Sequence, residues 1–455
     1  MIQPEASKVN LSPDSLVLRS RRLTGSTIAL VLCSAWLMRT PSLAQTIDAR
    51  GQDGSIEAES TAMPATSHDA DEQSAQTEAG KQGEAQAQKE TTKPGGTQSA
   101  DNKAEWVFAP IPISSPAIGS GLEWAVARVF PFNKKDEVSP PSMVGVGGIF
   151  TNNGSRAIAF GGRFYLKEDK YRITAAGAGA SINFDVYGIG KEAGDNGVFV
   201  PLNTKGGAFI GEFLHRLKKG VYVGLRGQYR NARMSINQER LESDDVTDQP
   251  PEQVAGVIDQ LRQEFLQQQT ISLGPRFQVD TRDSTFYPKH GVFAEVGSDF
   301  FGEAIGSKWS YQYYKASFNQ YNKLGEHQVL AFRGMGCAAV GDRVPIYDLC
   351  LFGTMNDLRG YPGGRYQDRR MFATQAEYRL MFPAKGLLGR FGIVAFAGVG
   401  GVDKSYSEIA FDELLPAGGG GLRFRLTKKY PIHFRADYGL GKGGHTFSMG
   451  VMEAF

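Results

Sequence analysis

The chain has 455 residues, with 50 Lys and Arg, 48 Asp and Glu, and a formal net charge of +2 at pH 7. The basic residues are spread along the chain, so no nucleic-acid-binding surface is expected. Beyond the N-terminal region no stretch approaches about eighteen consecutive apolar residues, which excludes membrane-spanning helices there.

The N-terminal region is typical of a secretory signal. Basic residues precede an apolar run, Ile28–Leu37, and the small residues Ser42 and Ala44 follow it. This run is shorter than a spanning helix requires. We therefore expect residues 1–44 to be a signal peptide, with an uncleaved anchor as the alternative.

Residues 45–105 contain no Phe, Trp or Tyr, and carry twelve acidic against five basic side chains. Such a segment buries too little apolar surface to offset the entropy lost on ordering. We expect a disordered, acidic periplasmic linker.

From Trp106 onward the chain is rich in glycine and aromatic residues, with 49 of the 56 glycines and 48 of the 49 aromatics. From Ile432 to Leu440 every even position is apolar, and every odd position is polar, charged or glycine. This period of two sorts side chains onto two faces of a strand. Bulky aromatics opposite repeated charges favour an outer-membrane barrel with lipid outside and water inside. The predicted fold of residues 106–455 is therefore an all-β, transmembrane antiparallel β-barrel.

The barrel is expected to have sixteen strands, because an even number places both ends in the periplasm. The segment from Ala117 to Phe132 should supply one or two of them. The others predicted from alternation are 142–151, 156–166, 171–187, 207–217, 221–236, 270–282, 292–300, 309–321, 328–340, 372–382, 390–402, 418–427, 432–441 and 446–455.

Short connections such as 218–220, 323–325 and 428–431 are expected to be periplasmic turns. The two long connections, 237–269 and 341–370, should be extracellular or fold inward. Apolar residues at helical spacing in the first predict a short helix on the barrel mouth, with a partner-binding helix as the alternative. These residues are Val254, Val257, Ile258, Leu261 and Phe265.

Cleavage of the signal peptide would leave two cysteines, Cys337 and Cys350. An exported protein can join them in a disulfide, because its compartment is oxidising. Two unpaired thiols are the alternative, and the sequence leaves both open.

The second long connection carries the motif Leu358-Arg359-Gly360-Tyr361. Glycine permits a tight reversal of the chain, and the planar guanidinium is suited to a carboxylate partner. The segment 357–366 resembles the inward-folding loop of the BamA/TamA superfamily, the bacterial surface antigen type of outer-membrane barrel. In that family an Arg-Gly-aromatic tip enters the lumen, and its arginine contacts acidic residues on the following strands.

Other segments resemble the same family in order, and the resemblance covers about residues 117–455. Asp280, Arg282 and Asp283 lie in its strand–turn signature, and 419–424 and 435–439 resemble its closing strands. The segment from Phe447 to Phe455 resembles the C-terminal strand that the barrel assembly machinery reads. The resemblance implies an outer-membrane location in a Gram-negative-type bacterium.

The sequence departs from the family in two places. Members that insert or translocate proteins usually carry periplasmic POTRA modules, whereas an aromatic-free segment precedes this barrel. The family often has an acidic residue at the position of Gly398, so Arg359 needs another partner. By strand phase Glu377 and Asp437 point into the lumen, and we expect Arg359 to pair with Glu377 first and Asp437 second. The alternative leaves Arg359 in water at the loop tip.

The sequence has no Gly-x-Ser-x-Gly, P-loop, His-Glu-x-x-His or Cys/His metal pattern. His433 shares the predicted lumen face with Arg435 and Asp437. A hydrated lumen network is favoured over a nucleophilic site built with a serine. We expect no enzymatic activity, no metal and no cofactor.

The resemblance implies a barrel that assists insertion or translocation of proteins or lipids at the outer membrane. Its lumen loop would be docked by Arg359, and its seam between first and last strands would open. The alternatives are a passive pore or structural surface barrel, and a surface adhesin. The expected partners are outer-membrane lipid, the barrel assembly machinery and a possible periplasmic protein.

Overall fold

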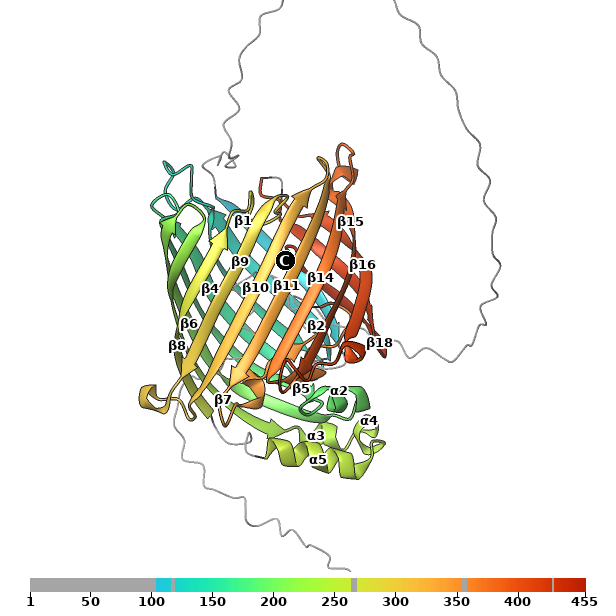
Figure 1. Ribbon diagram of the computed structural model, residues 1–455. Coiled ribbons are helices and arrows are strands. Elements are labelled where there is room, and N and C mark those ends of the chain that lie inside the picture. The colour runs from blue at the N-terminus through green and yellow to red at the C-terminus, as the bar shows by residue number, and fades with distance from the viewer. Residues whose placement is uncertain (1–103, 116–118, 263–267, 354–357, 428) are drawn as a thin grey trace, which may run out of the picture.

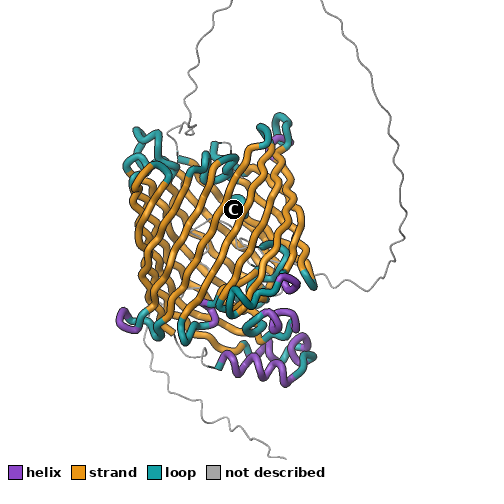
Figure 2. Tube along the Cα trace, viewed as in Figure 1, coloured by secondary structure: helices purple, strands orange, loops and turns teal. Residues whose placement is uncertain are grey.

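The computed structural model describes residues 104–455 except 116–118, 263–267, 354–357 and 428. The predicted signal peptide and residues 45–103 of the predicted linker lie outside the described residues. The described chain forms an antiparallel sheet of sixteen strands that curls into a barrel (Figures 1 and 2). The predicted fold class and strand number are therefore confirmed.

The sixteen barrel strands follow one another in chain order around the sheet, and two short strands, β12 and β13, form a separate pair. The barrel strands are β1 Glu105–Ser115, β2 Gly119–Phe130, β3 Ser142–Thr151, β4 Arg156–Leu166, β5 Tyr171–Val186, β6 Val200–Lys218, β7 Val221–Ile236, β8 Gln268–Asp280, β9 Gly291–Phe301, β10 Tyr311–Lys323, β11 Gln328–Val340, β14 Arg370–Met381, β15 Phe391–Asp403, β16 Leu415–Arg425, β17 His433–Gly441 and β18 Gly444–Val451. The separate pair is β12 Cys350–Phe352 with β13 Tyr366–Asp368.

Two strand predictions need correction. The segment expected from Ala117 is preceded by a complete additional strand, β1, which pairs with β2 along its whole length. The last strand was predicted to reach Phe455, but β18 ends at Val451. Met452 adopts a left-handed backbone conformation with φ of 74°, which turns the chain out of the sheet.

The predicted alternation between lipid and lumen holds along the strands. On β7 and β8 the side chains of Leu225 and Phe277 are about half exposed on the lipid side. Arg276, which precedes Phe277 on β8, points inward and is buried, with its guanidinium 2.6 Å from a carboxylate oxygen of Asp299. Lipid therefore solvates the apolar face, while charges pair inside.

The lumen wall is less uniform than the predicted charged lumen. The inward positions of β1 to β5 are mostly small or apolar, as Ala109, Ala159, Ala178 and Ile182 illustrate. Buried charges lie on β14, β16 and β17, on the other side of the seam, and also on β5, β8 and β9, as Arg172, Arg276 and Asp299 illustrate. Alternation alone did not reveal this division, because small residues fit either face of a strand.

The two ends of the barrel differ. β1 begins at the end with short turns, which we assign to the periplasm, and α2 to α5 lie at the opposite end (Figure 1). Val257 and Leu261 of the predicted helix are buried against strand-end side chains such as Leu202. None of the helices in the described part of the chain has the length and apolar content needed to cross a membrane. The helices are α2 Lys191–Asn196, α3 Gln238–Leu241, α4 Asp244–Thr247 and α5 Pro251–Leu261, with 3-10 turns η2 Glu303–Ile305, η3 Ile346–Asp348, η4 Leu388–Arg390 and η5 Phe411–Glu413.

A disulfide joins Cys337 of β11 to Cys350 of β12, with Cα atoms 5.7 Å apart. The sequence left open a disulfide or two unpaired thiols, and the structure contains the disulfide. The bridge attaches Cys350, in the long connection 341–369, to the inner wall of the barrel at Cys337. The two cysteines are thirteen residues apart in the chain.

Replacing Cys350 by Ser should lower the free energy of unfolding by about 3 kcal/mol, since closing a loop of this size constrains the unfolded chain by about that amount. Thermal unfolding in detergent, with and without reductant, measures the effect. Reductant should destabilise the wild type and leave a Cys337→Ser/Cys350→Ser variant unchanged. Equal sensitivity of the two proteins would contradict a structural role for the bridge.

Candidate functional site

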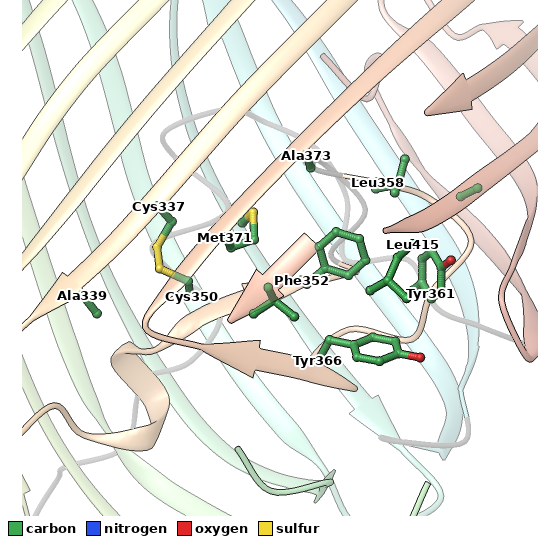
Figure 3. Packing of buried hydrophobic residues seen from close by; sticks show 12 residues of the cluster. Cys337, Ala339, Cys350, Phe352, Leu358, Tyr361, Tyr366, Met371, Ala373 and Leu415 are labelled. Carbon is green, nitrogen blue, oxygen red and sulfur yellow. A yellow bond between two sulfur atoms is a disulfide. The ribbon is translucent and has the colours of Figure 1, made fainter. Parts of the chain in front are cut away.

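The connection between β11 and β14 folds into the lumen and forms a packed apolar body there (Figure 3). Phe352, Leu358, Tyr361 and Tyr366 from the connection are all buried. They pack with residues of the wall such as Leu415. Asp357, in the predicted motif segment, lies outside the described residues.

Arg359 lies at the tip of this lumen loop and is only 2% exposed. Its guanidinium forms an ion pair with Glu377 on β14 and another, of 2.9 Å, with Asp437 on β17. Nε and Nη2 also donate to the side-chain oxygen of Gln375, at 2.9 and 2.6 Å. The guanidinium carbon lies 3.7 Å from the ring centre of Phe396, a distance suited to a cation–π contact. The structure thus brings Arg359 together with both acidic residues named from strand phase.

Two glycines make room for the loop. Gly360 has a φ of 126°, which side chains rarely allow, and a Cβ there would meet the backbone oxygen of Leu440 at 2.6 Å. On β15, a Cβ at Gly398 would lie 2.6 Å from a methyl group of Leu358. The glycine that departs from the family pattern therefore lies where Leu358 of this loop packs.

The ion pairs of Arg359 belong to a larger buried group, which we call the lumen cluster. It contains four arginines and three carboxylates, all with side chains no more than 2% exposed, and His433 at its edge. Arg423 contacts all three carboxylates, at 2.5 Å to Asp437, 2.7 Å to Glu453 and 3.7 Å to Glu377. The members are Arg359, Arg379, Arg423, Arg435, Glu377, Asp437 and Glu453.

Residues 452–455 enter the lumen instead of extending the last strand. The carboxylate of Glu453 accepts from Arg423 and lies 2.9 Å from Nδ1 of His433. The carbonyl oxygen of Phe455 accepts a hydrogen bond of 2.7 Å from Arg379. Phe455 was expected at the end of the C-terminal strand as part of the assembly signal, but it is buried in the lumen, whereas Phe447 lies within β18.

A second polar contact, the extracellular clasp, lies at the other end of the loop. Asp195 of α2 accepts from Tyr366 at 2.9 Å and pairs with Lys191 at 3.0 Å and with Lys442 of the β17–β18 turn at 3.4 Å. Burial acts to raise the pKa of the Asp195 carboxyl, but the hydrogen bonds from Lys191 and Tyr366 outweigh it and hold this pKa below its ordinary value. The clasp is therefore formed at neutral pH, and its contribution to stability is lost as the pH falls through that lowered pKa.

The family-signature residues lie near the periplasmic end, apart from the lumen cluster. Asp280 pairs with Arg282 at 2.8 Å and with Arg172 of β5 at 2.9 Å. The carboxylate of Asp283 accepts from the backbone of Lys289 and His290 and shapes the β8–β9 turn. These contacts tie strands and turns together and do not reach Arg359.

Sequence reasoning missed Gln375, Arg379, Phe396 and Glu453 as members of the site. Strand phase could have identified Gln375 and Arg379, because they alternate with Glu377 on β14. Glu453 could not be found in this way, since its position depends on the turn at Met452. Among the described residues, no group of three His, Cys, Asp or Glu side chains is placed to hold a metal ion.

Replacing Gly398 by Ala should destabilise the docked loop, because the added methyl group would also lie 2.2 Å from the backbone oxygen of Thr374. Overpacking of this kind costs about 1–3 kcal/mol. Thermal unfolding, combined with limited proteolysis of the lumen loop, measures the change. Gly325→Ala is the matched control, because a Cβ there has no neighbour within 4 Å. Equal behaviour of the two variants would contradict close packing of Leu358 on β15.

No curated protein matches the sequence. Among solved structures, BamA from Haemophilus ducreyi lacking POTRA domains 1–3 is 13% identical, with a TM-score of 0.49 over 77% of this chain and 70% of that one. CdiB from Acinetobacter baumannii is 11% identical, with a TM-score of 0.47 over 76% and 59%, and CdiB from Escherichia coli is 10% identical, with 0.49 over 76% and 62%. This chain spans less than two thirds of either CdiB chain.

The sequence itself matches the Omp85 superfamily domain over residues 150–441, which is more than half of the chain. The match includes the lumen loop, all four arginines of the lumen cluster and the strands β16 and β17. It confirms the BamA/TamA-type resemblance inferred from the loop motif and the outer-membrane location. The chain belongs to the Omp85 superfamily of outer-membrane β-barrels.

Proposed function

We propose that this barrel assists insertion or translocation of proteins or lipids at the outer membrane, using the seam between β1 and β18 as its moving part. Membership of the Omp85 superfamily supports the general role. Outer-membrane lipid, the barrel assembly machinery and a periplasmic protein are the partners that this role would require. We assign no catalytic step to the chain, and His433 acts as a structural partner of Glu453.

The observation that carries the proposal is the construction of the seam. Within the described residues β1 pairs only with β2 and β18 only with β17, so no hydrogen-bonded ladder joins the two ends of the sheet. Met449 and Val451 of β18 instead pack against an apolar cluster that contains Ile111 of β1. The barrel is therefore closed there by side-chain contacts.

A seam of this kind is cheaper to open than an ordinary strand pair. Each ladder hydrogen bond contributes roughly 0.5–1.5 kcal/mol, and β18 has only 8 residues against 13 in β15. Opening would break apolar contacts at β1 and leave every existing ladder intact. This arrangement favours a seam that can open over a barrel wall that stays closed.

The lumen loop supplies the second part of the proposed mechanism, a lock that keeps the lumen closed while the seam moves. The loop and residues 453–455 occupy the lumen and are held by the lumen cluster. A passive pore would require an unobstructed passage, so the filled lumen argues against that alternative. An adhesin that used the apolar face of α5 is also disfavoured, because Val257 and Leu261 are buried.

Cross-linking the seam tests the proposal. In cells that carry only an Ile111→Cys/Met449→Cys variant, a short bis-maleimide should reduce the abundance of the proteins or lipids that the barrel delivers. The readout is quantitative composition of the outer membrane, compared with a strain that lacks the barrel. N-ethylmaleimide on the same variant, and the bis-maleimide on an Ile149→Cys/Ala180→Cys variant of the same apolar cluster, are the controls. An outer-membrane composition unaffected by the seam cross-link would contradict a moving seam.

Arg359→Ala should release the loop and raise the steady conductance in planar bilayers several-fold, with a modest loss of stability. Three arginines would then face three carboxylates in the lumen cluster. Glu377→Gln should destabilise the barrel more, since four arginines would face two carboxylates, and breaking a buried pair costs about 3–5 kcal/mol.

Planar-bilayer conductance measures the release of the loop in Arg359→Ala. Thermal unfolding of both variants measures whether Glu377→Gln is the less stable of the two. Arg262→Ala is the control, because Arg262 pairs with Asp259 on the exposed surface and such pairs contribute little. Wild-type conductance together with a protease-resistant loop in Arg359→Ala would rule out the lock.

A further inference from the structure

The first strand of the barrel, which faces β18 across the seam, contains two prolines at alternate positions. They are Pro110 and Pro112, and both are exposed on the lipid side. Proline has no backbone N–H and cannot donate a hydrogen bond to a neighbouring strand. Alternate residues of a strand direct their backbone groups to the same side. The two prolines therefore remove two donors from one edge of β1.

The register of the sheet shows that this edge is the one at the seam. The carbonyl oxygen of Ser120 on β2 accepts a hydrogen bond from Asn152, which follows β3, so even-numbered residues of β2 direct their backbone groups toward β3. The partners of Pro110 and Pro112 on β2 are also even-numbered. The nitrogens of both prolines thus point away from β2 and toward the seam, while the β1–β2 ladder runs without interruption.

The edge of β18 that faces the seam has its full set of donors. Met452 donates to the carbonyl oxygen of His433 on β17 at 2.6 Å, and by alternation the even-numbered residues of β18 also face β17. The odd-numbered residues direct their N–H and C=O groups away from β17, and none of them is proline. They are His445, Phe447, Met449 and Val451. The missing donors therefore all lie on β1.

Pro275 of β8 shows what a proline does in this chain when it faces another strand. Ile271, which has the same parity, bonds through its N–H and C=O to Ser307 on the β9 side, so Pro275 also faces β9. The register of β8 with β9 runs to Leu273 and resumes at Arg276, omitting the two residues between. On its other side β8 pairs with β7 through the same residues without a break. One proline is enough to interrupt a ladder here.

Side-chain packing at the seam agrees with a strand that is kept out of a ladder. Met449 and Val451 lie on the face of β18 opposite to the buried Ser448, yet they pack against the apolar cluster that contains Ile111. Ile111 is itself buried on the lumen face of β1. Strands joined by a ladder carry like-facing side chains on the same side of the sheet. The end of β18 is therefore displaced inward from the position that pairing with β1 would give it.

We infer that Pro110 and Pro112 prevent the barrel from closing by a β1–β18 ladder, and so keep β18 a movable strand. Two of the four seam-facing donors between Trp106 and Pro112 are absent. The ring carbons that replace the two hydrogens point at the position that a paired strand would occupy. Closure by the side chains of Met449 and Val451 then replaces closure by hydrogen bonds. The position of the prolines follows from the register alone, whereas their role in regulating the seam rests on the proposed function.

Restoring the two donors tests the inference. Pro110→Val/Pro112→Val supplies two N–H groups on side chains that favour strands. Amide hydrogen exchange of β18, measured on the purified protein in nanodiscs, should slow by roughly tenfold or more, because each restored ladder bond stabilises the paired state. Pro275→Val is the matched control, since it also replaces a strand proline by valine and should leave the exchange of β18 unchanged.

Thermal unfolding verifies that each variant is folded. If the double variant does not fold, Pro110→Val and Pro112→Val made singly should each give part of the slowing. Unchanged exchange of β18 in the folded variants would overturn the inference, because the missing donors would then not keep the strands apart. Slowed exchange, together with an unaltered outer-membrane composition in cells that carry only the double variant, would support the inference and contradict the moving seam. The two proposals can therefore fail separately.

Discussion

Desolvation of Arg359 is the constraint on which the rest of the structure depends. A guanidinium that is 2% exposed in a barrel lumen is tolerated only if carboxylates and hydrogen-bond acceptors surround it. Those groups come from β14 and β17, and the same carboxylates attract Arg379, Arg423 and Arg435. One buried charge on a loop therefore contacts β14 and β17, the strands on either side of β15 and β16. These contacts fix where the loop must lie.

The lumen cluster and the seam are held by different kinds of contact, polar in the cluster and apolar at the seam. The cluster concentrates polar interactions on β14 to β17 and on residues 453–455, while the facing wall of β1 to β5 offers mainly small and apolar side chains. Hydrogen-bonded ion pairs are directional, whereas apolar contacts are not. The charged side is thus held in one arrangement, and the seam movement that we propose would displace β18 along the apolar side. The extracellular clasp at Asp195 links the two sides outside the membrane.

Strand phase predicted most of the barrel and part of the site. It gave fourteen of the sixteen strands and the inward direction of Glu377 and Asp437, because a period of two is a strong and local signal. The number sixteen came from the requirement for an even count, and β1 itself was not predicted. It could not give the path of residues 452–455, which depends on a single left-handed residue at Met452. Nor could it reveal that Gly398 accommodates Leu358, since that contact joins a loop to a strand forty residues away. Tertiary packing decides both.

Amide hydrogen exchange of the barrel in nanodiscs tests the central claim most directly, because one experiment reports on the lock and the seam together. The account predicts slow exchange at residues 358–361 and in β15, and much faster exchange in β18, whose outer edge has no ladder partner among the described strands. Fast exchange at 358–361 together with slow exchange in β18 would contradict a barrel that is locked inside and movable at its seam.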